Sequence, residues 1–401
     1  MKILVLDEEF PWPLNTGKRI RSYHLHRGLA QRHELSYLAF GRRESAGFVE
    51  LSEQKMNPVP VEVDLPAKSG IGFYYRLARN VFSPYPYSVD NHFQPEFAEA
   101  LENLLRRENY DLVLCEWTPY TRYVLNRSDL RRVVAAHNIE AQIWVRYAGA
   151  QSSRFRRAYL ASQAVKMERF ERRVFGTVEA ATAVSESDAE TIRGYNHRLP
   201  VEVIDNGVDL EYFRPADDSA RSSPSRLVFT GSMDWRPNQD AAIFFVRRIL
   251  PLLREQYSGI SFTIVGRNPS VSVRDLEKVE GVTVTGTVDD VRPYIAEAFT
   301  YVVPLRVGGG SRLKILEALA MRKPVISTTV GAEGLDLRVN EHLLIANEPD
   351  EWVEAVGAIL KDRDKATALG QSGRRLVEQR YGWPALVNKL DRFLHRLAGV
   401  S

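Results

Sequence analysis

The chain has few of the features that mark exported or membrane-spanning proteins. It has a single cysteine, Cys115, which excludes an intrachain disulfide and a cysteine-built metal site and fits a reducing cytosol. No apolar run approaches the length needed to cross a bilayer, and the start MKILVLDEEF has the pattern of a strand rather than of a secretion signal. We therefore expect a cytoplasmic protein that does not span a membrane.

Acidic and basic residues nearly balance over the whole chain. The 54 basic and 51 acidic residues give a net charge of +3, so there is no reason to expect a nucleic acid partner. One stretch differs, because between Arg146 and Arg173 there are eight basic side chains against Glu168 and Glu171. This pattern is typical of a basic amphipathic helix on an anionic membrane surface. A solvated charged face explains it equally, since core-type residues such as Tyr159 are also present, and both interpretations stay open.

The order of strands and helices predicts two domains built on the same plan. With 401 residues, of which 44% are hydrophobic, the chain is long enough for two cores of ordinary size. Strands are predicted at Lys2–Leu6, Leu35–Phe40, Asp111–Cys115, Val133–Ala136, Ala180–Val184, Val201–Ile204, Arg226–Thr230, Ser261–Val265, Val282–Thr285, Tyr301–Val303, Pro324–Ser327 and Leu343–Ala346. Helices are predicted near Gly17–Arg32, Pro95–Arg107, Glu140–Tyr147, Ser153–Phe175, Glu186–Tyr195, Asn238–Gln256, Val271–Val279, Val288–Ala298, Ser311–Arg322, Pro349–Lys361 and Asp364–Tyr381. Since alternating strands and helices form parallel sheets covered on both faces, we expect an α/β fold with two doubly wound, Rossmann-like domains.

The segment between the two halves has the composition of a linker. A turn at Asn206-Gly207 precedes a stretch rich in Pro, Ser and Asp. We predict an N-terminal domain over 1–206, a linker over 207–225 and a C-terminal domain over 226–382. Apolar residues at helical spacing predict one more helix within residues 383–401, which is expected to pack back on the N-terminal domain.

The most informative segment is GGGSRLKILEALAMRKPVIST, residues 308–328. Its glycines, Gly308, Gly309 and Gly310, let backbone approach a ligand closely, and Ser311 is a good N-cap for the helix that Arg312 continues. Lys314 and Glu317 share one face of that helix. The Lys314 cation could bind a phosphate, and the Glu317 carboxylate could bind a pair of hydroxyl groups. The pattern indicates a nucleotide-linked ligand. A glycine-rich turn before an ordinary amphipathic helix is the alternative.

Two residues of the first half also lie where ligands bind. In open parallel sheets that place is beyond the carboxyl ends of the strands, and two such domains facing one another make a deep cleft. Gly17 starts a helix after the first strand and can touch an anion there, although a plain strand-to-helix turn is equally consistent. His137 follows the strand Val133–Ala136 beside Asn138 and Glu140. A functional and a structural role for His137 both remain open.

Several motifs, taken together, match one family. The specific ones are IDNGVDLEYFRP at 204–215 and PLRVGGGSRLKILEALAMRKPVIST at 304–328. Weaker ones are FTGSMDWRPN at 229–238, TIVG at 263–266, VTGTVDDVRPYI at 284–295, VSESD at 184–188 and HNIE at 137–140. Over nearly its whole length the chain thus resembles the retaining nucleotide-sugar glycosyltransferases of family 4. The resemblance implies a GT-B fold, with two Rossmann-like domains facing a deep interdomain cleft.

The resemblance assigns roles in donor binding. Glu317 matches the second glutamate of a family pair and would hold the ribose hydroxyls, whereas Gly309 stands where the first glutamate belongs. The family's arginine and lysine for the donor diphosphate correspond here to Ser232 and Pro237. The residues implied to contact the nucleotide are Gly231, Gly266, Arg267 and Val288, through contacts that do not name the base.

Basic residues nearby are candidates to replace the missing cations. Lys314 is the first choice, with Arg236 and Arg312 beside it, because a departing diphosphate gathers charge that cations and backbone N–H groups stabilise. A solvated side chain is the alternative for Arg312. The reaction implied is sugar transfer with retention, in which the donor phosphate takes the acceptor proton and His137 contacts the sugar or acceptor. No metal and no other cofactor is expected, since Lys, Arg and a helix terminus meet the charge.

The sequence says least about the acceptor. Residues 70–92, GIGFYYRLARNVFSPYPYSVDNH, are aromatic and basic, as expected either for contact with sugars and lipid interfaces or for core packing. We expect a glycan, lipid-linked or other glycoconjugate acceptor. The leading interpretation is a role in cell-surface polysaccharide synthesis, with peripheral contact to the inner face of the cell membrane. Alternatives are a sugar-nucleotide epimerase on the same fold, a phosphorylase-like enzyme, or a non-catalytic sugar-nucleotide-binding scaffold. The scaffold is considered because Gly309 stands in place of the family's first glutamate.

Overall fold

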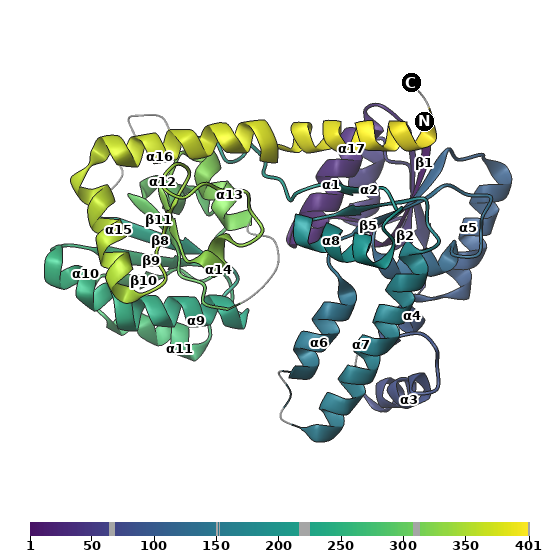
Figure 1. Cartoon of the computed structure of the whole chain (residues 1–401), viewed down its shortest axis with the longest axis horizontal. Helices are drawn as coiled ribbons and strands as arrows, with labels where there is room; N and C mark the ends of the chain where they lie inside the picture. The colour runs from purple at the N-terminus through teal and green to yellow at the C-terminus, as the bar shows by residue number, and fades with distance from the viewer. Residues whose placement is uncertain (64–68, 150, 152, 216–224, 308–312, 400–401) are drawn as a thin grey trace. The chain divides into compact units, whose positions relative to one another are not determined.

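The computed structural model describes residues 1–63, 69–149, 151, 153–215, 225–307 and 313–399. The chain divides into two compact units. The first unit comprises Met1–Asp205 together with Leu386–Ser401, and the second comprises Asn206–Ala385. Each unit is built on one parallel sheet with helices packed around it (Figure 1).

The sheet of the first unit has the strand order β3-β2-β1-β4-β5-β6-β7, and all its pairs are parallel. Its strands are β1 (Lys2–Glu9), β2 (Glu34–Phe40), β3 (Pro58–Val61), β4 (Leu112–Cys115), β5 (Arg132–Ala136), β6 (Ala180–Ala183) and β7 (Val201–Val203). Its helices are α1 (Gly17–Ala30), α2 (Ala46–Glu53), α3 (Ile71–Asn80), α4 (Tyr87–His92), α5 (Pro95–Arg107), a 3-10 turn (Thr118–Tyr123), α6 (Glu140–Gly149), α7 (Arg154–Phe175) and α8 (Glu186–Tyr195). The order reverses beside β1, so the ends of β1 and β4 flank the position where ligands bind in doubly wound sheets.

The sheet of the second unit has the order β10-β9-β8-β11-β12-β13, again with parallel pairs. Its strands are β8 (Arg226–Thr230), β9 (Ser261–Val265), β10 (Val282–Val284), β11 (Thr300–Val303), β12 (Val325–Ser327) and β13 (Leu344–Ile345). Its helices are α9 (Arg236–Phe244), α10 (Leu250–Gln256), α11 (Val271–Arg274), α12 (Arg292–Glu297), α13 (Leu313–Ala320), α14 (Thr329–Ala332), α15 (Pro349–Lys361) and α16 (Arg363–Leu376). The sequence-based expectation of two doubly wound α/β domains is confirmed.

Several elements differ from the sequence prediction. Strand β3 carries Pro58 and Pro60, which argue against a strand, but it lies at the edge of the sheet, where proline is tolerated. The predicted helix over 238–256 is divided by a π-helical segment, Phe245–Ile249. The aromatic segment after Gly70 forms the short helices α3 and α4. Helix α12 begins at Arg292 rather than at Val288, because Pro293 then takes a first-turn position that proline favours.

The described part of the predicted linker belongs to the second unit. Val208 is buried in the core of that unit, and its N–H donates to the carbonyl of Tyr381 at 2.9 Å. Arg374 donates to the carbonyl of Phe213 at 3.0 Å. Residues 207–215 are therefore packed against the second unit rather than forming a free linker. Burial of the apolar Val208 side chain stabilises this arrangement, whereas a solvated linker would leave that side chain in water. Residues 216–224 lie outside the described residues.

The last helix, α17 (Trp383–Ala398), belongs mainly to the first unit. Its apolar residues Leu386, Leu390, Phe393 and Leu394 are buried. Gly28 of α1 leaves room for Val387, because a Cβ on Gly28 would lie 2.4 Å from a Val387 methyl group. Arg32 also reaches this helix, with its guanidinium 2.9 Å from Asp391 Oδ2. The contact therefore has both an apolar and an ionic part.

The strands that carry the candidate sites are buried on both faces. Cys115 is a free, buried thiol on β4, and burial raises its pKa. Such a thiol packs as a small apolar side chain.

Among the residues that the structure describes, none of the helices combines the length and the apolar composition needed to span a bilayer.

Candidate active site

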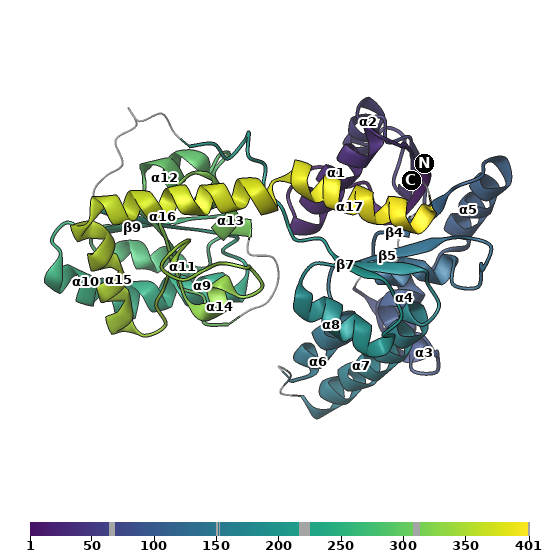
Figure 2. The same ribbon diagram turned by 45° about the horizontal axis from the view of Figure 1, so that its top comes forward.

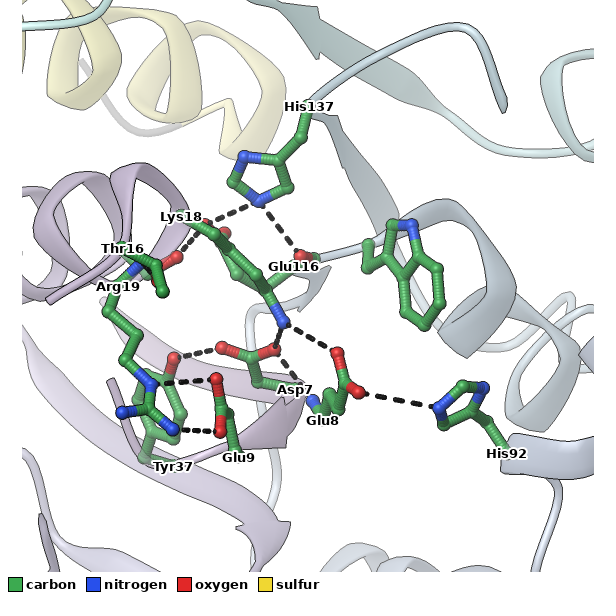
Figure 3. A network of polar contacts seen from close by, with 12 residues as sticks. Asp7, Glu8, Glu9, Thr16, Lys18, Arg19, Tyr37, His92, Glu116 and His137 are labelled. Carbon is green, nitrogen blue, oxygen red and sulfur yellow. Dashed lines mark hydrogen bonds and ion pairs between the residues drawn. The ribbon is translucent and has the colours of Figure 1, made fainter. Parts of the chain in front are cut away.

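A cluster of charged side chains lies at the carboxyl ends of the central strands of the first unit (Figure 3). Asp7 and Glu8 belong to the last part of β1, Glu116 follows β4, and His137 follows β5. Helix α1 adds Lys18. Because these strands are parallel neighbours, their ends meet at the edge where doubly wound sheets bind ligands.

Lys18 is the cation at the centre of this cluster. Its Nζ lies 2.7 Å from Asp7 Oδ1 and 3.4 Å from Glu8 Oε2. The hydroxyl of Tyr37 donates to the second Asp7 oxygen at 2.5 Å. Burial alone would lower the pKa of Lys18, but the charges of Asp7 and Glu8 outweigh it and raise that pKa. Lys18 is therefore a fixed cation at neutral pH.

Glu8 is held as an anion from two sides. Burial opposes its ionisation, yet the hydrogen bond with His92 and the charge of Lys18 lower the pKa of Glu8 to about 2. His92 lies on α4, with Nε2 3.4 Å from Glu8 Oε1. Glu8 therefore accepts hydrogen bonds throughout the physiological pH range.

Glu116 is a buried carboxylate with three partners. Ser22 Oγ donates to Oε1 at 2.7 Å, and His26 Nε2 lies 3.4 Å from Oε2. His137 Nε2 lies 3.2 Å from Oε1 and 3.0 Å from the Glu116 carbonyl oxygen. Although burial opposes ionisation, His26 and His137 hold the pKa of Glu116 well below its usual range. Nε2 of His137 therefore faces Glu116.

Gly17 is the first residue of α1, as the sequence predicted. Thr16 is the N-cap, and its Oγ1 accepts a hydrogen bond from the N–H of Arg19 at 3.3 Å. Arg19 also pairs with Glu9. The N-terminal turn of α1 is thus next to the Lys18 cluster. Anion contact at Gly17 stays a prediction.

In the second unit, two glycines let the loops after β8 and β9 approach each other. A Cβ on Gly266 would lie 1.7 Å from the carbonyl oxygen of Gly231. The N–H of Gly231 donates to the carbonyl of Val265 at 2.9 Å, and that of Met233 to the carbonyl of Arg267 at 2.9 Å. Backbone therefore lines this strand edge, as a site that binds its ligand through N–H and C=O groups requires.

Lys314 of α13 reaches the same strand edge. Its Nζ donates to Asn238 Oδ1 at 2.8 Å and lies 4.4 Å from the centroid of the Phe229 ring. It also lies 2.8 Å from where a Cβ on Gly231 would stand. Asn238 is buried and donates to the carbonyl of Ser232 at 2.9 Å. These contacts place a cation beside the end of β8.

Glu317 lies one turn after Lys314 and is partly buried. Burial raises the pKa of Glu317 to about 7, although the Lys314 charge opposes the rise. The nearby Tyr301 hydroxyl is paired with Thr230 Oγ1 at 2.5 Å. Glu317 is therefore a carboxyl group whose ionised form would gain from hydroxyl donors supplied by a ligand.

The other predicted donor residues are less closely grouped. Arg236 is exposed at the start of α9. Arg267 donates from Nε to Ser232 Oγ at 2.7 Å and so occupies the loop after β9. Val288 lies in the loop before α12 and is partly buried. The predictions on Gly308, Gly309, Gly310, Ser311 and Arg312 lie outside the described residues.

One further group has ligand types that suit a metal ion. Atoms of His33, Asp391 and His395 lie within 4.8 Å of one another. His33 precedes β2, at the edge of the sheet opposite to the Lys18 cluster. Asp391 already pairs with His33 at 2.6 Å and with Arg32 at 2.9 Å. We assign this group to the attachment of α17.

Comparisons with known families match both units. Residues 17–212 match the family described as Glycosyltransferase Family 4, and residues 224–362 match the one described as Glycosyl transferases group 1. The chain belongs to the family 4 glycosyltransferases. This family 4 enzyme is 29% identical over 218 residues to a GDP-mannose-dependent alpha-(1-6)-phosphatidylinositol monomannoside mannosyltransferase of Mycobacterium tuberculosis, covering 48% of this chain and 55% of that protein. It thus spans about half the length of that curated relative. An uncharacterized 44.6 kDa protein in the cps region of Klebsiella pneumoniae is 20% identical over 359 residues, 86% of this chain and 88% of the other.

Solved structures show the fold of this glycosyltransferase. A sucrose-phosphate synthase from Thermosynechococcus elongatus has a TM-score of 0.71 at 16% identity, with 100% of both chains covered. Anabaena HepE in complex with UDP and glucose has a TM-score of 0.66 at 13% identity, covering 99% of this chain and 100% of the other. The fold is GT-B.

The sequence placed His137 at a strand end, where it lies in this glycosyltransferase, but did not single out its neighbours in the cluster. Lys18, Glu8 and Glu116 were not predicted as site residues. A signal was available, because Glu8 and Glu116 are charged residues at the ends of apolar strands, where a sheet binds ligands. Lys18 gave no such signal on its own, since a lysine in the first turn of a helix is common on protein surfaces.

Proposed function

We propose that the chain transfers a hexose-like sugar from a nucleoside-diphosphate donor to a hydroxyl of a glycan or lipid-linked acceptor, with retention at the anomeric carbon. The observation that carries this proposal is Lys314 held by Asn238 beside Gly231, with Glu317 one turn away on the same helix. A cation, a closely approached backbone and a carboxyl group in one place suit a diphosphate and a ribose.

In the proposed reaction Lys314 stabilises the charge that builds on the departing diphosphate. A preorganised donor aimed at developing charge contributes about 3 kcal/mol in well-studied sites. Arg236 and Arg312 are proposed as additional cations, and Gly308, Gly309, Gly310 and Ser311 as phosphate-contacting residues. In this scheme the donor phosphate takes the acceptor proton, so the chain needs no resident metal to generate a base.

Glu317 is proposed to bind the ribose hydroxyls. Gly231, Gly266, Arg267 and Val288 would then surround the rest of the nucleotide, mostly through backbone. His137 is proposed to contact the sugar or the acceptor, and Gly17 an anionic group. Glu116 orients His137 through its Nε2, so that Nδ1 is available for a hydroxyl.

GDP-mannose is the first donor to test. Two curated relatives are named as mannosyltransferases, the one from Mycobacterium tuberculosis as GDP-mannose-dependent and another, of Rhizomucor pusillus, as an alpha-1,3/1,6-mannosyltransferase. UDP-glucose is the second, because the HepE structures contain UDP with glucose or UDP-glucose. The relative's name also supports a lipid-borne acceptor. We propose that the reaction occurs at the inner face of the cell membrane and serves cell-surface polysaccharide synthesis.

A second candidate is a non-catalytic sugar-nucleotide binder. It is favoured by Gly309, which stands where the resemblance places a glutamate close to the transferred sugar. An epimerase on the same fold would instead convert a sugar nucleotide without any acceptor.

The test is calorimetric titration with GDP, UDP and TDP, followed by incubation of the preferred nucleotide sugar with lysate-derived acceptors and mass spectrometry. A hexose added to an acceptor supports the transferase. Slow donor hydrolysis also supports the transferase. Binding with neither transfer nor hydrolysis supports the non-catalytic binder, and an isomerised donor supports the epimerase. Absence of binding to every nucleoside diphosphate and nucleotide sugar overturns the proposal.

A further inference from the structure

Three helices of the first unit project together from its sheet. Figures 1 and 2 both show α6 and α7 as a hairpin with α3 beside α7. Lys166 of α7 donates to the carbonyls of Asn80 at 2.6 Å and Val81 at 3.0 Å, and Gln163 donates to Asn80 Oδ1 at 3.0 Å. The end of α3 is therefore fixed to the middle of α7. At about 1.5 Å per residue, the 22 residues of α7 extend roughly 33 Å.

Helix α3 presents its apolar face to solvent. Ile71 is 91% exposed and Phe82, just after the helix, is 90% exposed. Tyr74 and Tyr75 are also exposed, at the helical spacing that puts them on the same face as Ile71. A surface helix of a globular protein ordinarily turns such a face to the core. The inverted orientation of α3 indicates that something apolar covers it in the functional state.

The hairpin has exposed apolar residues of its own. Phe155, at the start of α7, is 90% exposed, and Val165 lies further along the same helix, also exposed. Val145 and Tyr147 are exposed on α6. Phe155 and Val165 are ten residues apart, with the exposed small residues Ala158 and Ser162 at helical spacing between them.

The two sequence segments that carry these apolar side chains contain charge of one sign. Neither the segment from Gly70 to Val89 nor the segment from Ala141 to Met167 contains an aspartate or a glutamate. The basic residues in the two segments are Arg76, Arg79, Arg146, Arg154, Arg156, Arg157 and Lys166. The whole chain carries 51 acidic residues, so the absence of aspartate and glutamate is specific to these two segments.

We propose that the helical surface formed by α3, residues 81–82, α6 and the first half of α7 docks on an anionic lipid bilayer. Exposed aromatic and aliphatic side chains enter the interfacial region, while the arginines lie at the level of acidic headgroups. Each basic residue near such a surface adds about 1 kcal/mol of attraction. The exposed arginines Arg79, Arg146, Arg154, Arg156 and Arg157, together with the apolar anchors Ile71, Phe82 and Phe155, therefore suffice for reversible binding. A bilayer fits better than a protein partner, because the exposed apolar side chains are spread over separate helices and are accompanied by exposed arginines. The inference rests on the proposed function in one respect, namely that a membrane-bound enzyme reaches a lipid-linked acceptor.

The experiment is co-sedimentation of the full-length protein with lipid vesicles, without any nucleotide sugar. Vesicles of phosphatidylcholine with phosphatidylglycerol are compared with vesicles of phosphatidylcholine alone, at low and at raised salt. We expect binding to the acidic vesicles that weakens with salt because the charges are screened. The triple variant Arg154→Gln/Arg156→Gln/Arg157→Gln should lower the partition coefficient by about tenfold or more. The double variant Phe82→Ser/Phe155→Ser should also lower it, without abolishing its salt dependence.

Matched controls separate this surface from general charge and hydrophobicity. Arg43→Gln/Arg106→Gln/Arg107→Gln removes the same charge from exposed sites elsewhere in the first unit, and Val271→Ser/Val339→Ser removes exposed apolar residues of the second unit. Both should bind acidic vesicles like the unmodified protein. Equal binding of the test and control variants, equal binding to neutral and acidic vesicles, or no vesicle binding would overturn the proposal. Nucleoside-diphosphate titration of the same variants keeps the two proposals distinct, since loss of vesicle binding with normal donor affinity leaves the proposed function intact.

Discussion

Lys18 Nζ lies 2.7 Å from Asp7 Oδ1, and the Asp7 carboxylate is only 1% exposed. The pair joins the first turn of α1 to the end of β1, within the cluster that also holds Glu8. A charge buried to this degree depends on its partner, because its own solvation has been lost.

Replacing Lys18 with Met should therefore lower the free energy of unfolding by about 3 kcal/mol, since Asp7 is left buried without its cation. Chemical denaturation measures the loss. The double variant Asp7→Asn/Lys18→Met should be destabilised by less than the sum of the two single changes. The reason is that each single change leaves one uncompensated charge, whereas the double variant leaves none. Additive losses would show that the two side chains act independently.

Glu116→Gln tests whether Glu116 positions His137. We expect the donor dissociation constant to stay within about twofold of the wild-type value. Turnover should fall by about tenfold or more, because a neutral amide at position 116 holds His137 Nε2 less firmly than the carboxylate does. Transfer assays and calorimetry give the two quantities. Glu116→Asp, which keeps the charge on a shorter side chain, should recover part of the rate. Unchanged turnover in Glu116→Gln would contradict the positioning role.

Lys314→Ala tests the departing-group role. Turnover should fall by about a hundredfold, and by more than donor affinity does, because the charge that Lys314 meets is larger in the transition state than in the bound donor. Steady-state kinetics with calorimetry separates the two effects. Arg306→Gln is the control, since it removes another cation of the second unit, one that is paired with Asp240. An equal or larger loss in the control would move the role away from Lys314.

Glu317→Gln has two expected outcomes. Donor affinity should fall by about tenfold or more if the carboxylate binds ribose hydroxyls, because a charged acceptor makes the stronger hydrogen bonds. The second outcome follows from the pKa of about 7. A raised pKa means that the folded protein binds this proton more tightly than the unfolded chain, so wild-type stability falls as pH rises from about 4.5 through 7.

The variant lacks that titration. Relative to wild type, Glu317→Gln should therefore be more stable at pH 8 than at pH 5, by on the order of 2 kcal/mol. Denaturation at the two pH values measures the difference. A constant difference would mean that Glu317 is already ionised in the folded protein, and unchanged donor affinity would remove it from the ribose site.

Gly266→Ala should destabilise the second unit by about 2 kcal/mol, because the added Cβ would lie 1.7 Å from the Gly231 carbonyl oxygen and force the two loops apart. Donor affinity should fall with it, since both loops line the proposed nucleotide site. Gly194→Ala is the control. It lies in α8, where an added Cβ meets nothing within 4 Å, so thermal unfolding should be unchanged or slightly later. Similar losses in both variants would contradict a special requirement at Gly266.

The alternation of strands and helices was predictable because buried parallel strands are continuous apolar runs. Helices such as α5, α8 and α15 begin and end at the predicted residues. Helix α3 was not predicted, since its apolar residues face outward and its pattern does not mark a core. The edge strand β3 was missed because Pro58 and Pro60 disfavour a strand in all but an edge position.

The candidate site was predictable only in part. Glu317 and Lys314 are neighbours on one helix, so spacing alone placed them together. Lys18, Asp7 and Glu116 come from three elements that meet only because β1 lies between β2 and β4 in the sheet. Strand order is a tertiary property, and the sequence pattern of separate strands does not specify which ends become neighbours.

The sharing of α17 between the two units affects how the protein can fold during synthesis. Val387, Leu390 and Leu394 complete the core of the first unit, yet they are made after the whole second unit. Domains generally fold in the order in which they leave the ribosome. Here the first unit keeps the apolar surface around Gly28 uncovered until the second unit and then α17 have been made, and an N-terminal fragment ending at Asp205 would keep it uncovered permanently.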